Sequence, residues 1–286
     1  MLFKNQYYYF IAGLPDFTFD SMKLPFSVDE FVDMLEEELK PADLRLIRKY
    51  FLKHDNYNLL HLLENKDAVI NLAGNLPREV LLEVISKVKE DIPVKEKDVP
   101  PYFEDFIRRW LSEESHQEGA RVWEDLLSSL YMDYGIEVKN SLMSGWFELN
   151  LNIGNIMTAI FARKYDLMVA KYIVGHNTIA KLIRENSNAR DFGISQELDY
   201  FDILQRISEE SDIYDRERKI DKFKWDWLEE NTVFDYFNIE YIFAYLCKLQ
   251  ILERWVKLNA EEGEKVFRDL INSLKNETKL PDNFKK

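Results

Sequence analysis

The residue types that bind zinc are few in this chain. It has four histidines and one cysteine, whereas zinc sites need clusters of these two types. Glu113 and His116 have the Glu-x-x-His spacing of di-iron carboxylate bundles, but such a site needs the motif twice and it occurs here once. His54 and His61 could share a helix face only if Asn56 did not interrupt that helix. The sequence therefore predicts no metal site.

Nucleophilic and nucleotide chemistry also lack their usual patterns. Cys247 follows the apolar run Tyr241–Leu246, so we expect a small buried residue and not a nucleophile, which needs an accessible site. The acids Asp199 and Asp202 are spaced like an acid–base pair, but such pairs arise by chance among 52 acidic residues. The glycine-rich phosphate loops GxGxxG and GxxxxGK and the GxSxG elbow are missing. We expect no catalytic residue and no cofactor.

The composition indicates the elements that position these residues. Nine glycines and eight prolines in 286 residues are too few for the turns of sandwiches, barrels or doubly wound folds, so the fold class is all-α. The aromatic segment Tyr7–Ala12 resembles a short strand, and we expect at most this one strand in the fold. Ser27 and Glu30 have the spacing of a capping box, and Pro41 suits the start of the next helix.

Helical periodicity continues along the rest of the chain, with two polar breaks at 91–101 and 186–193. Asp43, Asn152 and Asn238 each precede an aliphatic residue where a long amphipathic run begins, which suggests three similar helical lobes over 1–95, 96–188 and 189–286. Beyond the first 64 residues we expect helices over about 78–89, 102–114, 117–138, 150–165, 195–209, 212–230, 238–258 and 260–276.

The charge bounds the partners. The chain has 38 basic and 52 acidic residues, a formal net charge of −14, so it does not suit nucleic acid, whose backbone binds clustered Lys and Arg. No run approaches the ~20 apolar residues of a membrane span, and the N-terminus lacks the features of a signal peptide. A single cysteine favours a reducing compartment.

Two helical segments carry a family resemblance, which rests on Asn155, Thr158, Ala162 and Arg163 in one and on Ala244, Tyr245, Leu246, Arg254 and Lys257 in the other. At these positions the segments resemble the C subunit of archaeal-type and bacterial V-type ATPases, the counterpart of the eukaryotic d subunit. Asp43–Tyr50 is a looser match to the same family. The stretch Tyr7–Asp16 followed by Ser27–Leu35 is similar to a bacterial family encoded in V-type ATP synthase operons.

The resemblance implies an all-α, three-lobed funnel without catalytic residues. Such a protein lies on the cytoplasmic face of the proteolipid ring, receives the foot of the central stalk and transmits torque, so its partners would be the ring and the stalk subunits. The chain would then be cytoplasmic and peripheral to the inner membrane. A helical scaffold of an unrelated assembly is the alternative, and an all-α carboxylate-metal enzyme a further one. The resemblance also implies a structural or interface role for the matching positions Asn155, Thr158, Arg163, Tyr245, Arg254 and Lys257.

Overall fold

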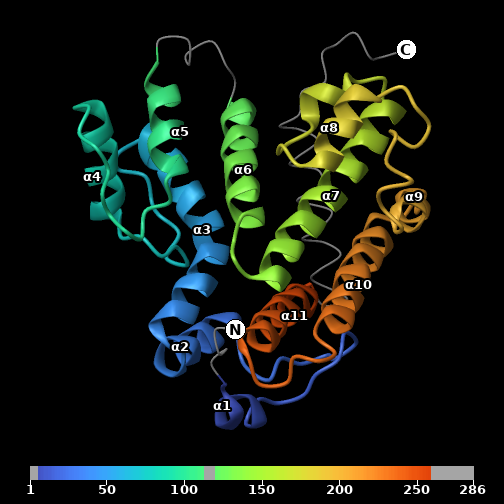
Figure 1. The fold of residues 1–286 in the computed structure, drawn as a ribbon, viewed down its shortest axis with the longest axis horizontal. Coiled ribbons are helices and arrows are strands. Elements are labelled where there is room, and N and C mark those ends of the chain that lie inside the picture. The colour runs from blue at the N-terminus through green and yellow to red at the C-terminus, as the bar shows by residue number, and fades with distance from the viewer. Residues whose placement is uncertain (1–5, 113–119, 259–286) are drawn as a thin grey trace. The chain divides into compact units, whose positions relative to one another are not determined.

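Every regular element in residues 6–112 and 120–258, the part that the computed structural model describes, is a helix (Figure 1). The expected all-α class is confirmed. The chain divides into two compact units, residues 1–38 with 212–286 and residues 39–211. The predicted lobe boundaries near 95 and 188 both lie within the second unit, and the three-lobed division stays a prediction. The expected helix over 260–276 and the Glu113–His116 pair lie outside the described residues.

The first unit joins the two ends of the described chain. Its helices are α1 (Tyr8–Ala12), α2 (Val28–Glu38), α10 (Ile213–Asn231) and α11 (Ile239–Lys257), and α11 packs on both α2 and α10. The capping box is confirmed, because the Ser27 amide donates to Glu30 Oε2 (2.7 Å) and the Glu30 amide donates to Ser27 Oγ (3.1 Å). Asn238 caps α11 as expected by accepting from the Tyr241 amide (3.2 Å).

The predicted strand at Tyr7–Ala12 is wrong. This segment forms the short helix α1, in which the Ile11 amide donates to the Tyr7 carbonyl (3.0 Å) and the Gly13 amide to the Tyr9 carbonyl (3.2 Å). A strand needs a neighbouring strand to satisfy its backbone, and the described residues contain none. The aromatic composition was therefore misleading, because the backbone pairs locally.

The second unit is a larger helical assembly. Its long helices α3 (Pro41–Glu64), α6 (Ala120–Ile136) and α7 (Ser141–Lys164) pack in sequence, α3 on α6 and α6 on α7. Pro41 occupies the first turn of α3, as expected. The shorter helices are α4 (Arg78–Lys89), α5 (Tyr102–Leu111), η2 (Val169–Tyr172), α8 (Thr178–Glu185) and α9 (Phe201–Ser208).

Two interpretations of asparagines in the second unit are wrong: Asn56 does not interrupt its helix, and Asn152 does not begin one. Helix α3 runs through Asn56, which is buried and accepts a hydrogen bond from the Tyr102 hydroxyl (2.8 Å). Asn152 does not start a helix, because α7 begins at Ser141 and is capped by Asn140. Both asparagines are buried and form hydrogen bonds with side chains of other segments, a role that local sequence does not distinguish from capping.

The described helices include none that is both long and apolar enough to span a bilayer.

Candidate functional site

The residues singled out by the resemblance lie on two helices of different units. On α7, Asn155 is buried and Thr158 and Arg163 are half-buried; on α11, Tyr245 is buried and both Arg254 and Lys257 are exposed. The structure thus gives two groups of residues, and each group is described within its own unit.

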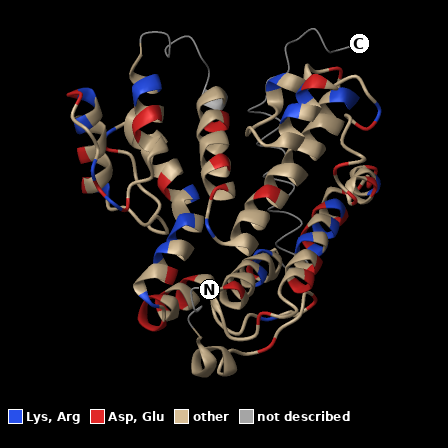
Figure 2. Cartoon of the chain, in the orientation of Figure 1, with Lys and Arg blue, Asp and Glu red and all other residues tan. Residues whose placement is uncertain are grey.

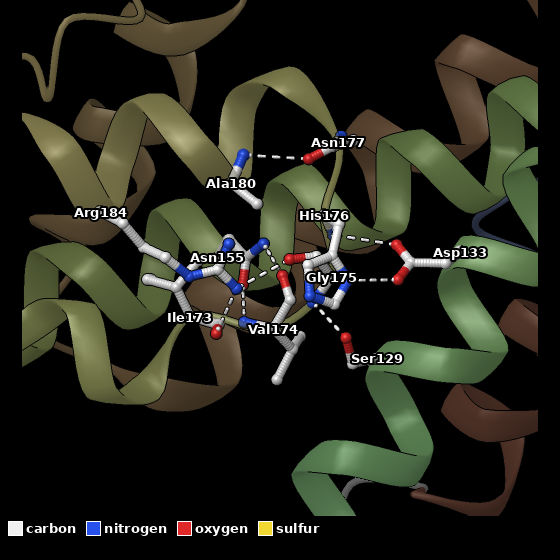
Figure 3. Close-up of polar contacts among 10 residues, drawn as sticks. All are labelled: Ser129, Asp133, Asn155, Ile173, Val174, Gly175, His176, Asn177, Ala180 and Arg184. Carbon is white, nitrogen blue, oxygen red and sulfur yellow. Dashed lines mark hydrogen bonds and ion pairs between the residues drawn. The ribbon is translucent and has the colours of Figure 1, made fainter. Parts of the chain in front are cut away.

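Asn155 holds the segment 173–177 that links η2 to α8 (Figure 3). Its Nδ2 donates to the Val174 carbonyl (2.8 Å), and its Oδ1 accepts from the Val174 amide (3.0 Å). A buried asparagine that pairs with both the N–H and the C=O of one residue fixes a loop as a strand partner would. Asn155 is therefore a positioning residue for this segment.

Helices α6 and α8 hold the same segment from other sides (Figure 3). On α6, Ser129 Oγ accepts from the Gly175 amide (2.9 Å), while the Asp133 carboxylate accepts from the His176 amide (2.9 Å) and contacts His176 Nδ1 (2.6 Å). On α8, Arg184 donates to the carbonyls of Ile173 (2.9 Å) and Gly175 (2.7 Å). The Asp133–His176 pair, which could orient an imidazole for proton transfer, here also fixes the backbone.

Arg163 organises the polar turn after α8. Its guanidinium donates to the carbonyls of Ser187 (2.7 Å), Ala189 (2.6 Å) and Arg190 (3.0 Å), and it lies over the Phe192 ring at 3.8 Å. Burial lowers the pKa of this guanidinium, and the negative charge of the nearby Asp191 acts in the opposite direction. The sequence left open a structural role or an interface role for Arg163, and these four contacts within the chain fit the structural role.

Arg254 pairs with a buried acid of α10. Its Nη1 lies 3.1 Å from Asp221 Oδ2 on α10, and its Nη2 donates to Glu217 (2.8 Å). Trp255 Nε1 also donates to Asp221 (3.0 Å). Burial raises the pKa of Asp221, while the positive charges of Lys224 and Arg254 lower it. Lys257, by contrast, pairs with Glu253 one turn away on the same helix (2.8 Å) and is 69% exposed.

Tyr245 lies in the aromatic core of the first unit. Its hydroxyl donates to the Pro15 carbonyl (2.9 Å), and its ring contacts Phe17 edge-on at 4.9 Å and Phe31 at 5.0 Å. Burial raises the pKa of the Tyr245 hydroxyl, which is consistent with a neutral hydrogen-bond donor. This residue ties the N-terminal segment to α11.

An exposed aromatic surface in the first unit was not predicted. Helix α1 lies beside the link between α10 and α11 (Figure 1), because the Tyr7 amide donates to the Phe237 carbonyl (2.7 Å) and the Tyr8 ring contacts Phe237 at 4.6 Å. Monomeric proteins rarely expose large contiguous apolar patches without a binding role. We call this patch the aromatic surface; its exposed members are Tyr8, Tyr9, Val233, Phe234 and Tyr236.

Charge around the aromatic surface is sparse. Tyr9 is 97% exposed and Phe234 87% exposed, yet within residues 6–15 and 231–239 the only charged side chain is Asp235. The runs Tyr7–Phe10 and Val233–Phe237 were visible in the sequence, but aromatic runs are equally typical of a buried core.

The described residues contain no cluster of three or more metal-binding side chains. His54 and His61 do lie on one continuous helix, but their ring nitrogens contact two different partners. His54 Nδ1 lies 3.2 Å from Asn71 Nδ2, and His61 Nδ1 lies 2.8 Å from the Tyr57 carbonyl. Cys247 is buried, as expected.

A family model described as "Protein of unknown function (DUF2764)" matches residues 4–278. The chain belongs to the DUF2764 family. No curated protein and no solved structure matches this DUF2764 chain.

Proposed function

We propose that this DUF2764 protein is a non-catalytic adaptor of a bacterial V-type ATPase that couples the central stalk to the membrane proteolipid ring. The sequence resemblance to the C subunit, at Asn155, Thr158 and Arg163 and at Tyr245, Arg254 and Lys257, supports the proposal. Within each unit the contacts of Asn155, Arg163 and Arg254 fix internal segments. Such positions preserve a fold, so partner contact falls to other residues.

The observation that carries a binding role is the aromatic surface. Tyr and Phe are enriched at protein interfaces because they bury large areas with few rotamers to order. Tyr9 and Phe234 are almost fully exposed on two segments joined by a backbone hydrogen bond. We infer that this surface contacts another protein of the ATPase.

Co-sedimentation tests the assignment. The purified chain is mixed with membranes from cells that contain the V-type ATPase and with membranes from cells that lack its genes. We expect the chain to sediment only with the first. Equal sedimentation with both, or with neither, would contradict the adaptor function.

A further inference from the structure

A pocket of about 290 Å³ lies in the second unit, between α3, the segment 75–77 before α4 and the segment 96–100 before α5. Four basic side chains line it. Arg45, Arg48 and Lys49 come from α3 with the i, i+3, i+4 spacing of one helix face, and Lys97 comes from the opposite segment. Figure 2 shows the Lys and Arg positions of α3 in blue.

Most of the other lining residues are apolar. Leu52, Leu76 and Val99 are buried and form part of the pocket wall, together with Pro77 and Tyr134. Lys49 Nζ lies 4.8 Å from the centre of the Tyr134 ring. The pocket thus offers cations beside a hydrophobic wall, the pairing that holds a ligand with a charged head and an apolar body.

The walls are fixed by buried hydrogen bonds. Asp55, fully buried on α3, accepts from the amides of Asn75 (3.1 Å) and Leu76 (2.8 Å) and from Asn75 Nδ2 (2.8 Å). Asn75 Nδ2 also donates to the Arg48 carbonyl (3.0 Å), which joins the loop to the basic face of α3. A preformed site loses little entropy when a ligand binds.

The local charge is opposite to that of the whole chain. Two carboxylates line the pocket, and one of them, Glu96, is held by an ion pair with Lys87, which lies outside the lining. The other, Asp98, is exposed. Four cations against two acids, in a chain of net charge −14, make this a local basic site and not part of a general basic surface.

We propose that this pocket binds a small organic phosphate. The phosphate is held by Arg45, Arg48, Lys49 and Lys97, because guanidinium groups match phosphate oxygens in a two-bond geometry. The apolar body of the ligand lies against Leu52, Leu76 and Tyr134. The pocket volume is near the lower end of the range for ligand pockets, so it suits a small molecule and not a polymer. The site lies in a different unit from the aromatic surface, so it goes beyond the adaptor function.

Titration calorimetry with phenyl phosphate tests the proposal, with inorganic phosphate and phenol as the separate head and body. We expect phenyl phosphate to bind the full chain with a Kd of about 1 mM or tighter. Each separate part should bind about tenfold more weakly or worse, because each lacks one half of the contacts. No binding of phenyl phosphate, or equal binding of either part, would overturn the proposal.

A pair of charge-reversal variants locates the site. The double variant R45E/K97E should weaken phenyl phosphate binding by about 30-fold or more, since it replaces two attractive charges with repulsive ones. The control K171E/K181E makes the same change in net charge at two exposed lysines of the same unit that do not line the pocket. It should bind within about twofold of the wild type. Equal losses in both variants would refute this location, and unchanged melting temperatures would show that both variants are folded.

Discussion

Buried asparagines secure two interhelical segments of the second unit in the same way. Asn155 pairs with both backbone groups of Val174, and Asn58 on α3 pairs with both backbone groups of Asn71, at 2.6 and 2.9 Å. Each segment is also held by an arginine of the following helix, Arg184 in one case and Arg78 in the other. Single polar side chains therefore define segments that have no regular structure.

The substitution Asn155→Ala should lower the free energy of unfolding by about 2–3 kcal/mol, because it removes two hydrogen bonds and leaves the N–H and the C=O of Val174 without these partners. Urea unfolding at pH 7 measures the loss. Asn150→Ala is the control on the same helix, since the Asn150 side chain donates to the Trp146 carbonyl one turn away and joins no second segment through that bond. Equal stabilities of the two variants would contradict the role assigned to Asn155.

At Arg254, the substitution Arg254→Gln should destabilise the chain by about 2–4 kcal/mol at pH 7, because it removes the cation that pairs with the buried Asp221 carboxylate. Burial already holds the pKa of Asp221 above its ordinary value, and loss of Arg254 raises it further. An acid whose pKa is raised by folding favours the folded state at low pH, and this contribution disappears as the pH rises through the folded pKa. The difference between wild type and variant should therefore shrink as the pH falls from 7 towards 4.

Urea unfolding at both pH values measures this difference. Lys257→Gln, at an exposed basic position of the same helix, should cost no more than about 0.5 kcal/mol at either pH. A loss for Arg254→Gln that stays constant with pH would show that Asp221 is not the group responsible.

Among the helices, packing between α6 and α7 depends on a glycine. A Cβ added at Gly135 of α6 would lie 2.1 Å from Phe147 Cδ1 of α7, whereas a Cβ at Gly154 of α7 would meet nothing within 4 Å. Tyr131 contacts the same Phe147 ring edge-on at 5.1 Å, so the ring cannot move away freely. The close approach of the two helices is set at this one position.

Alanine at the two glycines should therefore have opposite effects. Gly135→Ala should lower the free energy of unfolding by about 1–3 kcal/mol, through overpacking against Phe147. Gly154→Ala should raise it by about 0.5–1 kcal/mol, because alanine is the better helix former at this exposed position. Thermal unfolding of both variants tests the packing, and a stabilising Gly135→Ala would refute it.

Elements were more predictable than their contacts. Helices α4, α10 and α11 begin and end within about one residue of the sequence-based ranges, because apolar periodicity and capping are local signals. The expected helix break at Asn56 and helix start at Asn152 are wrong because the partners of these side chains, Tyr102 for Asn56 and Tyr200 and Asn177 for Asn152, are distant in sequence. The basic pocket brings residues 45 and 97 together, and their proximity depends on loops whose conformation apolar periodicity does not predict.

For the molecule as a whole, the two units divide the proposed tasks. The first unit carries the aromatic surface on α1 and the α10–α11 link, and the second carries the basic pocket beside α3. The C-subunit resemblance and the aromatic surface together favour an adaptor whose binding residues lie outside the matched positions.

Affinity purification of the tagged chain from detergent-solubilised membranes of its source tests the adaptor function most directly. The wild type should recover the proteolipid ring and central-stalk subunits of the V-type ATPase. Y9S/F234S, which alters the aromatic surface, should recover about tenfold less or none, while the control V69S/L72S, at two equally exposed apolar residues of the other unit, should match the wild type. Failure of the wild type to recover any part of the ATPase, or full recovery by Y9S/F234S, would contradict it.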